Sequence, residues 1–206
     1  TGVLTVFMAA PSPTLALRPL HAEILLAADR APGDDIAALQ ELWAIRRQED
    51  CAAMALLHTA FGHGDLADAV LRPETAEWED VFIPLAQHRR PREVRAVAEQ
   101  LTAQLNTTWR SCGQPQIVAP LAIGSHIDHQ LCFLAAEALQ QQGAQVWFYE
   151  DYPYAAQDAD RQARLCELGP QRQAHLVDIT AELPARLAAI RCYRSQLSAL
   201  FPAPVP

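Results

Sequence analysis

Two histidines and an aspartate stand within four residues of one another in the middle of the chain, as His126, Asp128 and His129. Imidazole nitrogens bind metals and exchange protons near neutral pH, and a carboxylate that accepts from a ring N–H fixes the tautomer of the ring. One histidine could therefore bind a metal while the other contacts the same substrate. The alternative is that Asp128 caps a helix and the histidines are ordinary polar loop residues.

The flanking sequence predicts how these three residues are held. Residues 117–120 are apolar and predict a buried strand, and a loop with Gly124 follows. Leu131, Leu134 and Leu139 then recur at helical spacing. A strand, a polar loop and a helix in this order place the loop side chains beyond the carboxyl end of a parallel sheet, where open α/β folds bind ligands.

Strands alternate with helices along the rest of the chain. Further strands are predicted at residues 1–9, 145–149 and 175–179. Helices are predicted at about residues 20–28, 34–58, 91–106, 158–168 and 180–200. Asp34 or Asp35 is expected to cap the second of these helices, and residues 61–64 are expected to form a loop. We therefore expect a single α/β domain over residues 1–206, with three layers and a mostly parallel, Rossmann-like sheet.

Composition excludes several classes of protein. The chain has 24 acidic residues against 16 basic ones, all of them arginine, and its net charge of −8 argues against binding to nucleic acid. No apolar run approaches the ~20 residues of a membrane-spanning helix. Five cysteines without a C-x-x-C pair indicate reduced thiols. These features predict a cytoplasmic protein that binds neither nucleic acid nor a membrane.

Several segments together resemble one family. Residues 124–129 (GSHIDH) resemble the G-x-H-x-D-H box of the LmbE-like (PIG-L) N-acetylglucosaminyl deacetylases. Residues 46–53 (RRQEDCAA) are similar to the family's R-R-x-E-D-x-x-A helix, and residues 68–72 (DAVLR) to its D-A-x-Y-R segment, with leucine in place of tyrosine. Residues 148–154 (FYEDYPY) and 3–11 resemble one bacterial branch. The matches keep the family's order and cover essentially the whole chain.

The resemblance implies a zinc-dependent hydrolase that removes an N-acyl group, usually acetyl, from a small-molecule amino sugar or related amide. By the family's pattern His129 is the zinc ligand, and His126 stabilises the oxyanion or protonates the amine. Asp128 is not expected to bind the metal. It is expected to accept a hydrogen bond from a histidine ring and so to orient that ring. Arg46 and Asp68 are expected to lie near the substrate.

One part of the family's pattern is missing from the sequence. The other metal ligands and the general base of the family come from an H-x-D-D box after its first strand, and the 206 residues contain no such box. Asp34 and Asp35 have no histidine nearby, and Glu150 and Asp151 are interpreted as charged residues at the end of a strand. We therefore expect the family's first β-α unit to lie before Thr1.

Three explanations of the missing box stay open. A preceding segment supplies it, or the chain is a catalytically degenerate domain that only binds a ligand, or another chain or residue completes the site. A missing strand would also expose apolar surface, which predicts poor solubility or self-association as a homo-oligomer. A nucleotide-binding α/β protein is a further alternative, disfavoured because the sequence has no G-x-G-x-x-G or P-loop motif.

Overall fold

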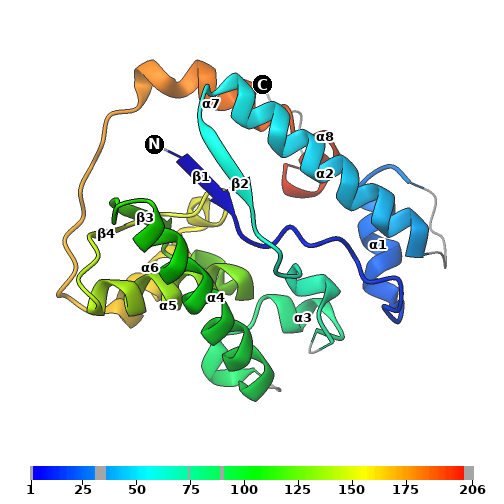
Figure 1. The fold of residues 1–206 in the computed structure, drawn as a ribbon, viewed down its shortest axis with the longest axis horizontal. Helices are drawn as coiled ribbons and strands as arrows, with labels where there is room; N and C mark the ends of the chain where they lie inside the picture. The colour runs from blue at the N-terminus through cyan, green and yellow to red at the C-terminus, as the bar shows by residue number, and fades with distance from the viewer. Residues whose placement is uncertain (1, 31–35, 74, 89–90, 202–206) are drawn as a thin grey trace. The chain divides into compact units, whose positions relative to one another are not determined.

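The computed structural model describes residues 2–30, 36–73, 75–88 and 91–201 (Figure 1). The chain divides into two compact units. The first unit combines the residues up to Arg72 with those from Ala174 onward, and the second runs from Pro73 to Gln173. In Figure 1 the first unit is therefore coloured blue to cyan and orange to red.

The first unit contains a parallel pair of strands and a set of helices. Strand β1 (Gly2–Thr5) pairs with β2 (Ala60–His63), so that Gly2 lies opposite Ala60 and Thr5 opposite His63. The other elements are α1 (Pro19–Ala27), α2 (Ile36–Leu56), the 3-10 turns η1 (Ala69–Leu71) and η5 (Thr180–Glu182), α7 (Leu183–Ile190) and α8 (Arg194–Leu200).

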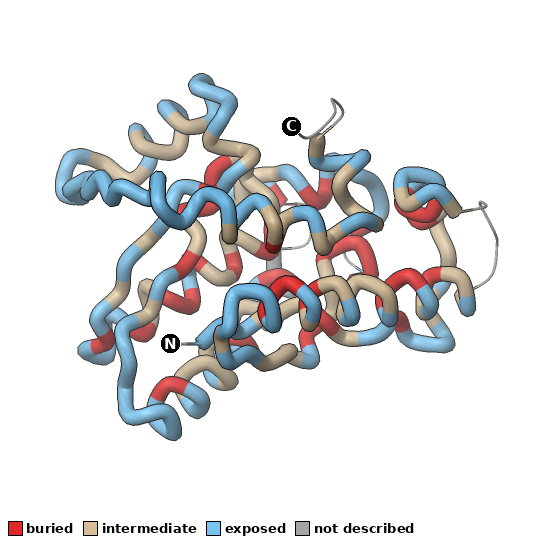
Figure 2. The backbone as a smooth tube through the Cα atoms, turned by 90° about the horizontal axis from the view of Figure 1, so that it is seen from above, coloured by how far each residue is buried: buried red, intermediate tan, exposed pale blue. Residues whose placement is uncertain are grey.

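Helix α2 supplies much of the buried surface of the first unit. Leu39, Leu42 and Trp43 are spaced three and four residues apart and are fully buried, as expected for one face of a helix. Further along the helix, Ala53 and Met54 form a cluster with Ala189 of α7. Figure 2 shows buried and exposed positions alternating along the helices in this way. Buried apolar side chains thus join the two sequence-distant parts of the unit.

The second unit also carries one parallel pair of strands. Strand β3 (Ile117–Pro120) pairs with β4 (Val146–Tyr149), so their carboxyl ends lie at the same edge. The other elements are α3 (Trp78–Val81), η2 (Leu85–Gln87), α4 (Pro91–Ser111), η3 (Ile123–Ser125), α5 (Ile127–Gln141), η4 (Tyr154–Ala156) and α6 (Asp158–Leu168).

Helix α5 is the central helix of the second unit. Ile127, Leu131 and Leu139 are buried along one face, as their spacing predicts, whereas Leu134 is exposed. On the same helix Phe133 packs against Phe148 of β4 with 4.7 Å between ring centroids. This packing fixes the start of α5 close to the carboxyl ends of the two strands.

The predicted α/β class with parallel strands is confirmed, because both described strand pairs are parallel. Within the described residues, however, the strands form two separate two-stranded sheets, and the three-layer arrangement stays a prediction. The loop expected at residues 61–64 is largely strand β2, since hydrogen bonding with β1 outweighs the turn preference of glycine. The capping residues Asp34 and Asp35 lie outside the described residues.

Two predictions in the last part of the chain are wrong. Residues 175–179 form no strand, and Leu176 and Val177 are exposed, with no pairing partner in the described chain. The single helix expected at residues 180–200 is instead η5, α7 and α8, with a break around Tyr193. Among the described residues, no helix is both long and apolar enough to span a membrane.

Candidate functional site

The loop after β3 is held in an unusual backbone conformation by the side chain that follows β4. Ala122 and Gly124 both have positive φ, at 63° and 75°. The Asp151 carboxylate accepts from the backbone N–H of Leu121 at 2.8 Å and from that of Ile123 at 3.0 Å. It is only 1% exposed. Because these two bonds flank Ala122, they stabilise a left-handed residue that would otherwise cost energy.

Gly124 cannot be replaced without moving an aromatic ring. A Cβ atom added at this position would lie 2.8 Å from Cδ1 of Tyr154, and the positive φ disfavours other residue types as well. The Tyr154 ring in turn contacts both histidines of the motif, with centroid distances of 6.4 Å to His126 and 5.5 Å to His129. The glycine of the motif therefore permits a tyrosine to pack beside the histidine pair.

His129 is oriented by the same buried carboxylate. Its Nδ1 lies 3.1 Å from Oδ2 of Asp151, and its side chain is 32% exposed. An ionised carboxylate only accepts hydrogen bonds, so Nδ1 carries the proton and Nε2 has a free lone pair. Metal-binding histidines commonly have this arrangement, in which a carboxylate fixes the tautomer and raises the basicity of the ring. The geometry therefore suits His129 as a ligand through Nε2.

His126 has the opposite arrangement. It is the N-cap residue of α5, and its Nδ1 accepts from the backbone N–H of Asp128 at 3.2 Å. Because a backbone N–H only donates, Nδ1 carries no proton and the ring proton is on Nε2. The two rings are 5.1 Å apart. The two neighbouring imidazoles thus carry their ring proton on different nitrogens, Nε2 in His126 and Nδ1 in His129.

Asp128 is predicted to support one of the histidines, and the carboxylate that the structure places beside His129 is that of Asp151. Asp151 was interpreted as a charged residue at a strand end, whereas it is buried and bonded to the ring. A signal was present, because β3 and β4 are predicted strands whose ends would meet if paired in parallel. Asp128 is buried in the first turn of α5, but the helix is capped by His126. The supporting role of Asp128 stays a prediction.

The two predicted substrate contacts lie in the first unit, whereas the histidines lie in the second. The Arg46 guanidinium lies 4.5 Å from the centroid of the Trp43 ring. Burial lowers the pKa of Arg46, and the nearby carboxylates of Asp68 and Glu49 oppose that shift. Asp68 also accepts from the backbone N–H of Val70 at 3.1 Å. The contact of Arg46 and Asp68 with a substrate stays a prediction.

The described residues do not form a complete catalytic zinc site. Within them, no group of three or more His, Cys, Asp or Glu side chains is arranged to hold a metal ion. A catalytic zinc commonly has three protein ligands. The described residues offer one suitable ligand nitrogen, on His129, together with the Asp151 carboxylate that orients it.

No protein-family model matches the chain. A 2′-N-acetylparomamine deacetylase from Streptomyces fradiae is 34% identical over 106 residues, which are 50% of this chain and 37% of that protein. The matched segment thus spans little more than a third of the length of this curated relative. The sequence likeness is therefore to a part of a deacetylase.

Solved structures of deacetylases resemble nearly the whole chain. A zinc-inhibited form of a teicoplanin deacetylase matches 97% of this chain and 74% of its own, with a TM-score of 0.73 and 23% identity. A deacetylase–teicoplanin complex matches with a TM-score of 0.74 and 22% identity over 96% of this chain and 76% of its own. An A40926 pseudoaglycone deacetylase has a TM-score of 0.62 and 23% identity over 97% and 72%. The chain has the fold of these deacetylases.

Proposed function

We propose that this chain belongs to the LmbE-like family and acts as an N-deacetylase, hydrolysing the N-acyl amide of an amino sugar or a related small molecule. The named relatives support this proposal, since the sequence match and the structural matches are all to deacetylases. The motif at residues 124–129 supports it independently. The proposal treats residues 1–206 as one cytoplasmic domain of that family.

The observation that carries the proposal is the opposite arrangement of the two adjacent imidazoles. Amide hydrolysis needs stabilisation of an oxyanion and a proton for the departing amine. The Nε2–H of His126 can donate to the oxyanion and then to the amine. The lone pair of His129 suits a metal ion, and a zinc ion would lower the pKa of its water toward ~7 and polarise the carbonyl. Arg46, Asp68 and Asp128 are proposed to support the substrate and the site.

Measuring zinc content and acetate release tests the proposal on the full chain. Protein whose metal site is completed by further ligands is expected to contain stoichiometric zinc and to release acetate from at least one N-acetylated amino sugar. His129→Ala should lose both properties, because the ring that would bind the metal is gone. His175→Ala is the matched control, since His175 is exposed and lies in the other unit. It should retain both.

A second variant isolates the role of His126. Asparagine is a good N-cap, so His126→Asn should keep α5 intact while removing the ring donor. Loss of one oxyanion donor typically slows a reaction about 10²- to 10³-fold, and acetate release should fall by that amount. If folded protein with a completed site contained no metal and released no acetate from any such sugar, the deacetylase proposal would fail. The alternative of a catalytically degenerate binding domain would then be favoured.

A further inference from the structure

The side chain of Gln130, the residue after His129, joins α5 to two other segments of the second unit. Its Nε2 group donates to the backbone carbonyl of Ile83 at 2.9 Å and to that of Ser125 at 2.6 Å. Its Oε1 atom accepts from the backbone N–H of Leu85 at 3.0 Å. Because carbonyl oxygens only accept and a backbone N–H only donates, these partners fix which way the amide faces. One side chain therefore uses both of its donors and its acceptor.

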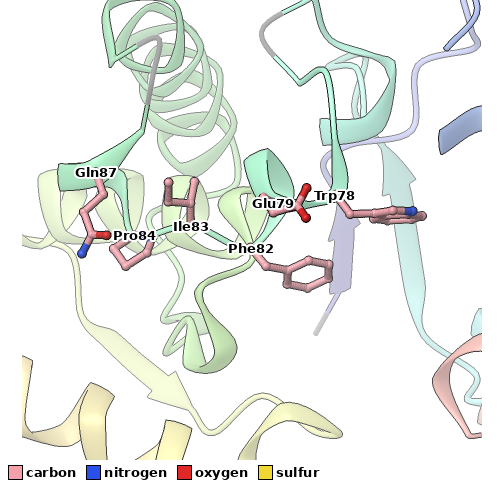
Figure 3. Close-up of a pocket in the computed structure, with 6 residues that line it drawn as sticks. All are labelled: Trp78, Glu79, Phe82, Ile83, Pro84 and Gln87. Atoms are coloured by element: carbon pink, nitrogen blue, oxygen red, sulfur yellow. The ribbon is translucent and has the colours of Figure 1, made fainter. Parts of the chain in front are cut away.

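The first segment that Gln130 holds is the turn between α3 and η2, which contains Pro84. A proline disfavours the helical conformation of the residue before it, so α3 ends before Ile83 and the carbonyl of that residue is available to a side chain. Pro84 is also the N-cap residue of η2, and it has no side-chain oxygen that could accept from Leu85. Figure 3 shows Phe82, Ile83 and Pro84 following one another along this turn. Gln130 therefore supplies the hydrogen bonds that the proline cannot.

The second segment is the end of the histidine loop. Ser125 directly precedes His126 and has a positive φ of 58°, which is costly for a residue other than glycine. The bond from Gln130 falls on the carbonyl of Ser125, which belongs to the peptide that joins these two residues. Asp151 holds the beginning of the same loop through two backbone N–H groups. The loop is thus held at both ends, and Gln130 holds the end next to His126.

Both segments meet at the ring of His126. The Phe82 ring, carried by the turn before η2, lies 5.1 Å from the His126 ring with an interplanar angle of 84°. Aromatic rings attract one another in this edge-to-face geometry. The backbone of His126 continues directly from the strained Ser125. The amide of Gln130 therefore holds both the ring that packs on His126 and the peptide from which His126 extends.

We propose that Gln130 is a positioning residue for His126 and holds its ring where Nε2–H reaches the reacting amide. This inference rests on the proposed deacetylase function, in which His126 is the proton donor. The primary amide matches its three partners chemically. A glutamate carboxylate would have no donor and would face two carbonyl oxygens, and a methionine would leave the three backbone groups without this partner.

NMR signals of the His126 ring protons test this position on the full chain, without metal or substrate. Spectra at about pH 8 keep the ring neutral. Phe82→Leu is the reference, since it removes the aromatic ring current that acts on His126. Gln130→Met keeps the length of the side chain and should move the His126 signals in the same direction as Phe82→Leu. Gln140→Met is the matched control, because Gln140 is an exposed glutamine of the same helix, and it should leave the signals unchanged.

Kinetics of protein with a complete metal site separate positioning from substrate binding. A displaced catalytic group can slow a reaction about 100-fold, so Gln130→Met is expected to lower kcat about 10- to 100-fold. KM should stay within about twofold of the wild-type value, because the donor acts mainly on the transition state. A purely structural role would reduce the amount of folded protein but leave the His126 signals of the folded fraction unchanged.

Wild-type His126 signals in folded Gln130→Met would overturn the proposal, and so would a wild-type kcat. If Gln130→Met does not fold, comparing Ser125→Gly with Ser125→Gly/Gln130→Met repeats the test, since glycine adopts a positive φ readily. The two proposals can fail separately. Shifted signals without acetate release from protein with a complete metal site support Gln130 as the positioning residue and contradict the deacetylase, whereas acetate release with unchanged signals does the reverse.

Discussion

Each unit of the molecule contains a buried carboxylate bonded to a histidine, yet the two pairs differ in what surrounds them. In the first unit Oδ2 of Asp50 lies 2.8 Å from Nε2 of His63. In the second unit Oδ2 of Asp151 lies 3.1 Å from Nδ1 of His129. The residue types and distances are nearly the same. The remaining partners of each carboxylate and the exposure of each ring decide what the pair does.

The Asp50–His63 pair is buried among other side chains of the first unit, which use the remaining acceptor capacity of the carboxylate. Besides His63, the carboxylate accepts from the hydroxyl groups of Thr5 at 3.0 Å and of Tyr193 at 2.6 Å. These donors come from β1, β2 and the junction between α7 and α8, so the carboxylate on α2 joins four parts of the unit. The His63 side chain is only 10% exposed. This network of side chains stabilises the unit.

The Asp151 pair is open to a ligand. The other two donors to the Asp151 carboxylate are backbone N–H groups of a strained loop. The His129 side chain is three times as exposed as that of His63. The carboxylate therefore fixes a loop and points a ring outward. A buried His–Asp pair suggests a ligand site only where the second ring nitrogen can be reached. The comparison predicts that Asp50 matters mainly for stability and Asp151 mainly for the site.

The largest expected effect is on stability, from Asp50→Ala. The change leaves His63, Tyr193 and Thr5 without their buried acceptor, and breaking a buried network of this kind typically costs about 3–5 kcal/mol in the free energy of unfolding. Urea unfolding measures the loss. Glu41→Ala is the control, since the Glu41 side chain is 64% exposed and its ion pair with Arg30 should contribute less than about 1 kcal/mol. A loss in Asp50→Ala no larger than in the control would show that the network does not stabilise the unit.

A smaller effect on stability, but a larger one on metal binding, is expected from Asp151→Asn. Asparagine keeps the size of the side chain but has one acceptor oxygen in place of two. It therefore cannot accept from both backbone N–H groups of the loop and from His129 as the carboxylate does. Removing the carboxylate partner of a metal-binding histidine commonly weakens metal affinity about 10- to 100-fold, or about 1.4–2.7 kcal/mol. Zinc affinity, measured by competition with a chelator, checks this. An unchanged affinity would contradict the orienting role of Asp151, whereas Asp50→Asn should leave zinc affinity near the wild-type value.

Much of the secondary structure of the second unit is predicted correctly, because its strands and helices have a clear apolar pattern within their own residues. Residues 117–120 and 158–168 form the strand and the helix that their spacing and apolar content predict. The helix after His129 is also present, because its apolar residues recur along one face. The histidine motif was placed correctly at a strand-to-helix junction for the same reason.

The errors come from contacts between residues that are distant in the sequence. Residues 175–179 have the composition of a strand, but a strand also needs a pairing partner, and none lies beside them in the described residues. Residues 61–64 look like a turn until the pairing with β1 is known. Asp151 was missed because its donors are 22 to 30 residues away. The residue type at a single position does not show whether an acidic side chain is solvated or buried.

The smallest predicted effect concerns the pH dependence of the Asp50 network. Burial, and next the hydrogen bond to Asp50, raise the pKa of Tyr193 above its ordinary value near 10. Above about pH 10 the unfolded chain loses this proton while the folded chain keeps it, so this part of the stability is present below pH ~10 and falls as the pH rises.

Tyr193→Phe removes both the hydrogen bond and its pH dependence. At about pH 8 the variant should be less stable by about 1 kcal/mol, the usual value of one hydrogen bond, or somewhat more because the acceptor is a buried carboxylate. Between about pH 9 and pH 11 its free energy of unfolding should fall less steeply than that of the wild type, because one tyrosine with a raised pKa is missing. Urea unfolding across this range measures both, with the exposed Tyr152→Phe as the control.

Parallel pH curves for wild type and Tyr193→Phe would mean that the hydroxyl of Tyr193 ionises as readily in the folded chain as in the unfolded one. In that case the Asp50 network would not be closed to solvent, and its contrast with the exposed His129 pair would no longer hold.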